Sequence, residues 1–240
     1  MSSKRMHNPE IERIIERQMR QWEMGRSEQT KKEQQAHLEM AGGHRIDYIT
    51  LSRELGSGGV HIARILSEKL KWQMYDKEIL DYMADDMQVQ KHLLESVDER
   101  TVGWIEEWIA PIFTHKPVDQ LTYYRSLAKE LLVLSRHGQA IILGRAAGLI
   151  LPRKNGLSVR ITAPFELRCE RYAQEYKLSV GEAKSVVEKK DQSQKSFVHD
   201  MLNYDIVDCR HYDIMINTEF IKPESAAKLI WRALDQRRQN

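Results

Sequence analysis

Short β-rich runs alternate with longer amphipathic stretches along most of the chain. Apolar and β-branched runs predict five strands, at residues 48–52, 72–75, 140–143, 157–162 and 214–217. Apolar positions at helical spacing predict helices near residues 60–70, 77–94, 119–136, 164–176, 179–190 and 223–237. This alternation predicts an α/β fold, with a parallel sheet of about five strands covered by helices on both faces. Ligands of such sheets bind beyond the carboxyl ends of the strands, so we expect the functional residues there.

The N-terminal region has the pattern of one amphipathic helix. Asn8 suits a helix N-cap and Pro9 suits the first helical position. The residues at helical spacing on its apolar face are Ile11, Ile14, Ile15, Met19 and Trp22. This face must be covered by the chain's own domain, by a second copy in a homo-oligomer, or by a partner protein bound through residues 9–24.

A polar stretch at residues 25–44, ending in Gly42-Gly43, predicts a linker after this helix. We therefore expect an N-terminal helix and linker at residues 1–44 and one domain at residues 45–240. The 240 residues allow one domain of ordinary to large size, so this division fits the length.

Composition narrows the class of protein. The chain is 41% apolar and 30% charged. This composition is too apolar for a disordered chain and too charged for a membrane protein. The net charge of +2 argues against a nucleic-acid coat, although a local basic cleft remains compatible with it. The N-terminus lacks a secretory signal core, and Cys169 and Cys209 form no disulfide framework. We expect a cytoplasmic protein with no membrane or nucleic-acid partner.

The segment that follows the first predicted strand has the composition of a phosphate-binding loop. It reads SRELGSGG at residues 52–59, directly before a predicted helix. Its glycines allow successive backbone N–H groups to face one anion, and the helix N-terminus adds positive potential. A tight turn without a ligand is the alternative. The loop lacks the lysine of the GxxxxGK[ST] pattern, so Arg53 is the nearest replacement cation and Ser57 the nearest hydroxyl for a phosphate or a magnesium-bound water.

Five motifs in order carry a resemblance to a known family: ITLSRELGSGGVHIARILSEKL, MYDKEIL, AIILGRAAGLIL, VRITAPFELRCERY and HYDIMINTEFIKPESAAKLI. Together they resemble the cytidylate kinase-like family, a branch of the small P-loop nucleoside monophosphate kinases, over roughly residues 45–236. The resemblance implies a P-loop NTPase-type three-layer fold with a helical lid at about residues 177–210. It also implies ATP-dependent phosphoryl transfer to a nucleoside monophosphate, with CMP or dCMP as the expected acceptor.

The resemblance also assigns roles to residues. The loop would hold ATP, with Mg²⁺ bridging the donor phosphates, through Ser52, Gly56, Ser57, Gly58 and Gly59. Asp76 falls in the acceptor region, and a helix N-cap is its other interpretation. Arg145 follows the third strand, where an arginine can hold the acceptor phosphate with a bidentate fork; a surface salt bridge is the alternative.

Further cations lie in the C-terminal half. Arg168 and Arg171 share a helix face that the resemblance places near ATP, with a solvated cationic face as the alternative. In the lid, Asp191 belongs with the substrate, and Lys190 and Lys195 would contact the transferred phosphoryl group. The family pattern has an arginine three residues after this aspartate, where this chain has Gln194.

Because phosphoryl transfer depends on positioned cations, this replacement puts fast catalysis in question. Three hypotheses stay open. The protein is a cytidylate-like kinase, a nucleotide-binding module with reduced or lost turnover that serves as a sensor or assembly partner, or a kinase for another small metabolite.

Overall fold

The computed structural model describes residues 8–36, 48–113 and 118–239, and its centre is a five-stranded parallel sheet in the order β2-β3-β1-β4-β5. The strands are β1 (Tyr48–Arg53), β2 (Gln73–Tyr75), β3 (Ala140–Leu143), β4 (Gly156–Thr162) and β5 (Ile214–Asn217). Every neighbouring pair is parallel. The predicted α/β fold with about five parallel strands is therefore confirmed, and all five predicted strands are present.

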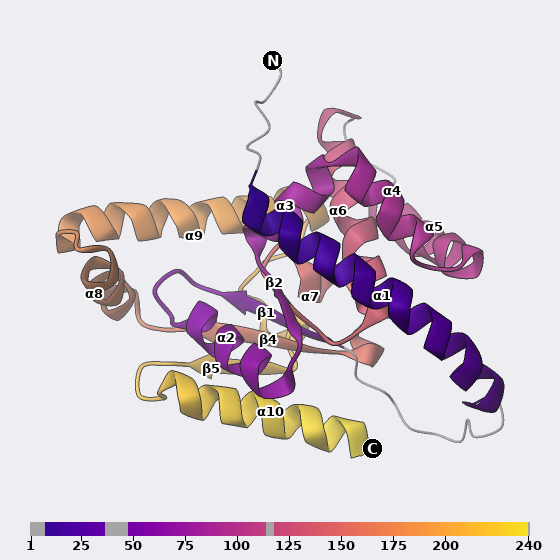
Figure 1. Ribbon diagram of the computed structural model, residues 1–240. Helices are drawn as coiled ribbons and strands as arrows, with labels where there is room; N and C mark the ends of the chain where they lie inside the picture. The colour runs from indigo at the N-terminus through magenta and orange to yellow at the C-terminus, as the bar shows by residue number, and fades with distance from the viewer. Residues whose placement is uncertain (1–7, 37–47, 114–117, 240) are drawn as a thin grey trace.

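Helices cover both faces of this sheet and complete a three-layer fold (Figure 1). In chain order they are α1 (Pro9–Ala36), α2 (Gly59–Leu70), α3 (Lys77–Asp85), α4 (Met87–Glu95), α5 (Glu99–Phe113), α6 (Val118–His137), α7 (Ala147–Ile150), α8 (Phe165–Tyr176), α9 (Val180–Leu202) and α10 (Pro223–Gln239). Short 3₁₀ turns lie at Arg153–Asn155 and Cys209–His211. One apolar cluster joins the sheet to α2 and α10, and a second joins its other face to α1 and to α3 through α7.

Several helices differ from the sequence prediction. The helix expected at residues 77–94 is divided, because Asp86 ends α3 and caps α4 by accepting hydrogen bonds from the backbone N–H groups of Gln88 and Val89 at 2.9 and 3.1 Å. The α5 helix lies outside the predicted helices. The α9 helix is 23 residues long and extends well beyond the predicted end at residue 190.

The apolar face of α1 packs on the chain's own domain. Ile11 and Ile15 are buried in the cluster that contains α3 and α6. The Trp22 ring stacks on the His137 ring, with centroids 3.9 Å apart. The helix continues to Ala36, through part of the segment that was expected to be a linker; residues 37–47, the rest of that segment, lie outside the described residues. In the described part of the chain, no helix combines the length and hydropathy needed to cross a membrane.

Candidate active site

The loop between β1 and α2 bends sharply at two glycines. Gly56 and Gly58 have φ angles of +79° and +80°, in the left-handed region that favours glycine. A Cβ atom on Gly56 would lie 2.3 Å from the carbonyl oxygen of Arg168, so this position has no room for a side chain. Gly59 then begins α2, whose first backbone N–H groups have no partner within the helix. The loop therefore ends at a helix N-terminus suited to an anion.

Ser57 in this loop faces the protein interior. Its side chain is fully buried, and its hydroxyl donates to the carbonyl oxygen of Glu54 at 2.7 Å. Its own carbonyl accepts from the Thr218 hydroxyl at 2.8 Å. Contact between Ser57 and a metal-bound water stays a prediction, and it requires this hydroxyl to turn. Among the described residues, no group of three or more His, Cys, Asp or Glu side chains is placed to hold a metal ion.

A buried network of charged groups supports the loop from behind. The Arg160 guanidinium, 3% exposed, donates to the Ser52 hydroxyl at 2.9 Å and lies 3.5 Å from a Glu54 carboxylate oxygen. The other Glu54 oxygen lies 3.4 Å from Nε of Arg168. Ser52, which we predicted to bind the donor, thus has its hydroxyl engaged by Arg160. These contacts fix the end of β1 to β4 and α8.

The two arginines of α8 bind protein groups. Arg168, 5% exposed, donates to both carboxylate oxygens of Asp191 at 3.2 and 2.8 Å, and to the Leu55 carbonyl at 3.1 Å. Arg171 donates to the hydroxyl and the carbonyl of Thr218 at 3.1 and 2.8 Å. Burial rules out the alternative of a solvated face for Arg168. The predicted donor-binding and substrate-binding roles of Arg168 and Asp191 stay predictions, and the structure joins the two side chains as a pair.

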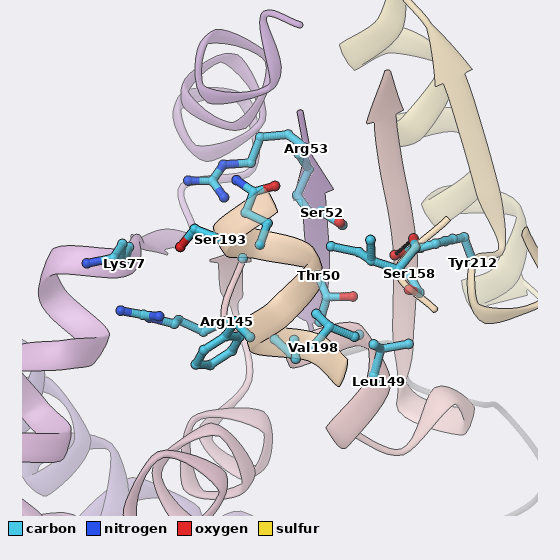
Figure 2. Close-up of a pocket in the computed structure, with 18 of the residues that line it drawn as sticks. Thr50, Ser52, Arg53, Lys77, Arg145, Leu149, Ser158, Ser193, Val198 and Tyr212 are labelled. Atoms are coloured by element: carbon cyan, nitrogen blue, oxygen red, sulfur yellow. Dashed lines mark hydrogen bonds between the residues drawn. The ribbon is translucent and has the colours of Figure 1, made fainter. Parts of the chain in front are cut away.

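A pocket opens beside the loop at the carboxyl ends of β1 and β3. Four cations from separate elements line it: Arg53 from β1, Lys77 from α3, Arg145 after β3 and Lys190 from α9. In Figure 2, Lys77 and Arg145 lie on one side of the pocket and Arg53 lies above them. The carboxyl ends of neighbouring parallel strands meet at one sheet edge, which explains why cations so distant in sequence converge.

Arg145 is held in position by acidic and aromatic neighbours. It follows β3 in a left-handed conformation, with φ of +53°, and its guanidinium pairs with Asp81 of α3. The Phe197 ring centroid lies 4.8 Å from the guanidinium carbon, and the Tyr123 hydroxyl donates to Asp81 at 2.8 Å. Although burial by itself raises the pKa of Asp81, hydrogen bonds from Arg145 and Lys77 outweigh it and leave that pKa lowered. The carboxylate therefore stays charged and orients both cations.

Arg53 and Lys190 form no such ion pair with a described residue. Neither side chain forms a hydrogen bond or an ion pair with any residue that the structure describes. Burial lowers the pKa of both groups, and the charge of Arg145 lowers them further. Asp76 works in the opposite direction on the pKa of Arg53. Partly buried cations without an ion-pair partner are costly, so this part of the pocket favours an anion.

Asp76 itself is an N-cap. Its carboxylate accepts from the backbone N–H groups of Glu78 and Ile79, at 3.0 and 3.1 Å, at the start of α3. The structural interpretation of this residue therefore holds. A contact between Asp76 and an acceptor stays a prediction that is compatible with the cap.

Sequence reasoning missed Lys77, and of the two lid lysines that it named, Lys190 and Lys195, only Lys190 lines the pocket. Lys77 directly follows Asp76 at the carboxyl end of β2, and this position was the signal that could have identified it. On α9, Lys190, Ser193 and Gln194 line the pocket, whereas Lys195 is exposed and lies outside the lining. One residue turns a helix by about 100°, which separates Lys195 from Gln194.

Comparisons with known proteins agree with this architecture. The model of the cytidylate kinase-like family matches residues 48–220. A cytidylate kinase of Thermoplasma volcanium is 25% identical over 190 residues, covering 78% of this chain and 91% of the relative. A cytidylate kinase of Thermoplasma acidophilum is 32% identical over 98 residues, covering 40% of this chain and 52% of the relative.

A solved structure has the same fold. The crystal structure of an uncharacterized protein from Eubacterium ventriosum matches with a TM-score of 0.61 at 24% identity, covering 80% of this chain and 99% of that one. The family match spans the phosphate loop, the cation pocket and the lid region. The chain therefore belongs to the cytidylate kinase-like family, as its five motifs predicted.

Proposed function

We propose that this protein transfers the γ-phosphoryl group of ATP to a nucleoside monophosphate, with CMP or dCMP as the acceptor. One observation carries the proposal: Arg53, Lys77, Arg145 and Lys190 line one pocket beside a glycine-rich loop, and two of these cations, Arg53 and Lys190, form no ion pair with any described residue. Two phosphorylated substrates would supply the missing negative charge. Membership of the family and relatives named cytidylate kinases support this choice of chemistry.

The donor would bind at the loop, where the N-terminus of α2 faces its phosphates. Arg145, oriented by Asp81, would hold the acceptor phosphate, because an arginine fork binds two phosphate oxygens at once. Arg53 and Lys190 would lie between donor and acceptor and stabilise the charge on the phosphoryl group during transfer. The acceptor phosphate oxygen attacks the γ-phosphorus and ADP leaves, so no covalent enzyme intermediate is needed.

Mg²⁺ would neutralise donor phosphate charge when bound. The described side chains supply no acidic ligand set for it, so the phosphates would provide most of its ligands. The α9 helix would exclude water from the reacting groups, because it carries Lys190, Ser193 and Gln194 over the pocket. Arg168 joins α9 to the loop, and this attachment would hold Lys190, Ser193 and Gln194 at a fixed position relative to the donor.

A steady-state assay tests the proposal. The protein is supplied with ATP, Mg²⁺ and one nucleoside monophosphate at a time, and ADP release is followed. We expect turnover with CMP and dCMP above that with AMP, GMP and UMP, and above the ATPase rate without acceptor. ATP binding without acceptor-dependent ADP release for all five monophosphates would contradict the proposal.

One observation favours a second candidate, a nucleotide-binding module with reduced or lost turnover. Gln194 lines the pocket at the position where the family pattern has an arginine, so one transition-state cation is missing. On this alternative the protein binds nucleotides as a sensor or assembly partner. The same assay separates the candidates, because the module predicts saturable nucleotide binding with no product.

A further inference from the structure

Two of the four pocket cations depend on one short segment of the chain. Residues 73–85 form β2, the capping residue Asp76 and α3, and we call this segment the β2–α3 unit. Its Lys77 lines the pocket. Its Asp81 pairs with Arg145 and accepts a hydrogen bond from Nζ of Lys77 at 2.8 Å. The directions of both cations therefore depend on where the β2–α3 unit lies in the fold.

The β2–α3 unit is weakly built by itself. The strand β2 has three residues and lies at the edge of the sheet, where β3 is its only paired neighbour among the described strands. The helix α3 has nine residues, and isolated helices shorter than about 12 residues are marginally stable in water. Such elements are held in position mainly by packing against their neighbours.

The N-terminal helix α1 contacts both elements of this unit. The Tyr82 hydroxyl of α3, one residue after Asp81, donates to a carboxylate oxygen of Glu12 at 2.8 Å. Arg17 donates to the side-chain carbonyl oxygen of Gln73 in β2 at 3.2 Å. In Figure 1, α1 begins next to α3 and continues past β2. The helix is therefore attached to the strand and to the helix of the β2–α3 unit.

Apolar packing reinforces these polar contacts. Ile11 and Ile15 of α1 are 8% and 6% exposed, and they belong to the same apolar cluster as α3. The buried face of α3 in that cluster consists of Ile79, Leu80, Met83 and Ala84. Farther along α1, the Trp22 ring stacks on His137, the last residue of α6. The helix α1 thus joins the β2–α3 unit to the end of α6.

We infer that α1 positions Lys77 and Asp81, and through Asp81 also Arg145, for the phosphate of the acceptor. The inference rests on the proposed function for the role of the pocket. Glu12 is then a positioning residue, because it lies outside the described lining of the pocket and acts through α3. The N-terminal helix precedes residues 48–220, which the family model matches, so the chain would use a segment outside that match to order its acceptor site.

Calorimetric titration of the full-length protein with CMP and with ATP tests this inference. Glu12→Ala removes the acceptor of the Tyr82 hydrogen bond, and Ile15→Asp places a charge in the apolar contact and should release α1. We expect CMP binding to weaken about two- to fivefold in Glu12→Ala and about tenfold or more in Ile15→Asp, because the competent position of the β2–α3 unit becomes less populated. ATP binding should be unchanged, since the phosphate loop is not part of the unit, and it also reports that each variant is folded.

Two further variants of α1 separate positioning from a general effect of substitution. Glu12→Gln keeps an oxygen that can accept from Tyr82 and should restore most of the CMP affinity. Glu16→Ala is the matched control on the same helix, because Glu16 is exposed and pairs with Arg20 of α1. It should alter the binding of neither nucleotide.

Unchanged CMP affinity in both Glu12→Ala and Ile15→Asp would overturn the inference. Equal losses of CMP and ATP affinity in Glu12→Ala would also overturn it, because they would indicate a general loss of stability. In either case the proposed function stands if the wild-type protein converts CMP to CDP. If the wild-type protein binds ATP but not CMP, the proposed acceptor is wrong and the inference fails with it.

Discussion

Arg168 on α8 donates two hydrogen bonds to the carboxylate of Asp191 on α9, at 3.2 and 2.8 Å. The same guanidinium donates to the carbonyl of Leu55 in the phosphate loop at 3.1 Å. Through one buried side chain, the helix that carries Lys190 and Gln194 is tied to the loop proposed to bind ATP. The position of the lid helix over the pocket therefore depends on this pair.

Replacing the aspartate of this pair should loosen α9. We expect Asp191→Asn to lower the free energy of unfolding by about 2 kcal/mol, because a charge-assisted bond to a buried guanidinium becomes a neutral one. Urea unfolding measures the loss, and amide hydrogen exchange should rise along residues 180–202. Glu166→Gln, which breaks the exposed pair with Lys184, is the control and should cost less than about 1 kcal/mol. Equal losses in both variants would contradict the role assigned to Arg168.

Arg145 should tolerate no other cation. Arg145→Lys keeps the charge but loses the fork, so we expect kcat/KM with CMP to fall by on the order of 10²-fold or more. Arg153→Lys, in a partly exposed pair with Asp213, should leave the rate unchanged. Urea unfolding of both variants separates a loss of folding from a loss of chemistry. A fully active Arg145→Lys enzyme would remove Arg145 from the acceptor site.

Gln194 lines the pocket, which makes the missing arginine testable. We expect Gln194→Arg to raise kcat about tenfold or more, since an added cation would stabilise the phosphoryl group in transfer. Lys195→Arg changes the exposed neighbour and should have no effect. If turnover of Gln194→Arg does not exceed that of the wild type, the glutamine is not the limiting feature.

We expect anion binding to weaken at alkaline pH as Lys190 loses its proton. Burial lowers the pKa of Lys190, and the charges of Lys77, Arg53 and Arg145 lower it further, so it loses its proton at a lower pH than an exposed lysine. Affinity for sulfate, whose own charge is constant over this range, should fall as the pH rises through this lowered pKa. Lys190→Arg should bind sulfate with a flat profile. Identical profiles for the two proteins would show that another group controls binding.

Glu130 on α6 should make stability depend on pH. It is 2% exposed, and neither carboxylate oxygen has a hydrogen-bond partner among the residues that the structure describes. Burial raises the pKa of Glu130 well above its ordinary value, with Asp85 and Asp81 adding to the effect. Between the pKa of the unfolded state and that of the folded state, Glu130 therefore keeps its proton in the folded protein and has lost it in the unfolded chain. Stability is fully present below the unfolded pKa and declines by about 1.4 kcal/mol per pH unit as the pH rises toward the folded pKa.

Urea unfolding at several pH values measures this decline. The free energy of unfolding of Glu130→Gln should fall less than that of the wild type between mildly acidic and mildly alkaline pH, because the amide does not titrate. Glu107→Gln, at an exposed position on α5, should keep the wild-type dependence. The account of Glu130 would be wrong if its variant also kept that dependence.

Local patterns predicted the sheet and the loop because each depends on neighbouring residues. Apolar runs identified β1 and β3, and the glycines before α2 marked a turn that needs positive φ at Gly56. Helical spacing identified the apolar face of α1, but periodicity says only that a face must be covered. That Ile11 and Ile15 pack on the chain's own domain follows from tertiary packing, which spacing does not encode.

The candidate site was less predictable because its key relationships join distant elements. Arg168 and Asp191 are 23 residues apart on two helices, so sequence reasoning assigned them separate ligands. Asp81 was missed as the partner of Arg145 because the pair spans 64 residues. In both pairs sequence reasoning could name a charged residue, but it could not name the partner that the fold brings to that residue.

The most direct test of the central claim is to follow the phosphoryl group itself. ³¹P NMR of a mixture of the protein, ATP, Mg²⁺ and CMP distinguishes transfer to the acceptor from hydrolysis. The account predicts CDP and ADP in equal amounts, and loss of both signals in Arg145→Ala. Nucleotide binding with no CDP, or ADP accompanied only by inorganic phosphate, would contradict the claim that the four-cation pocket is a kinase acceptor site.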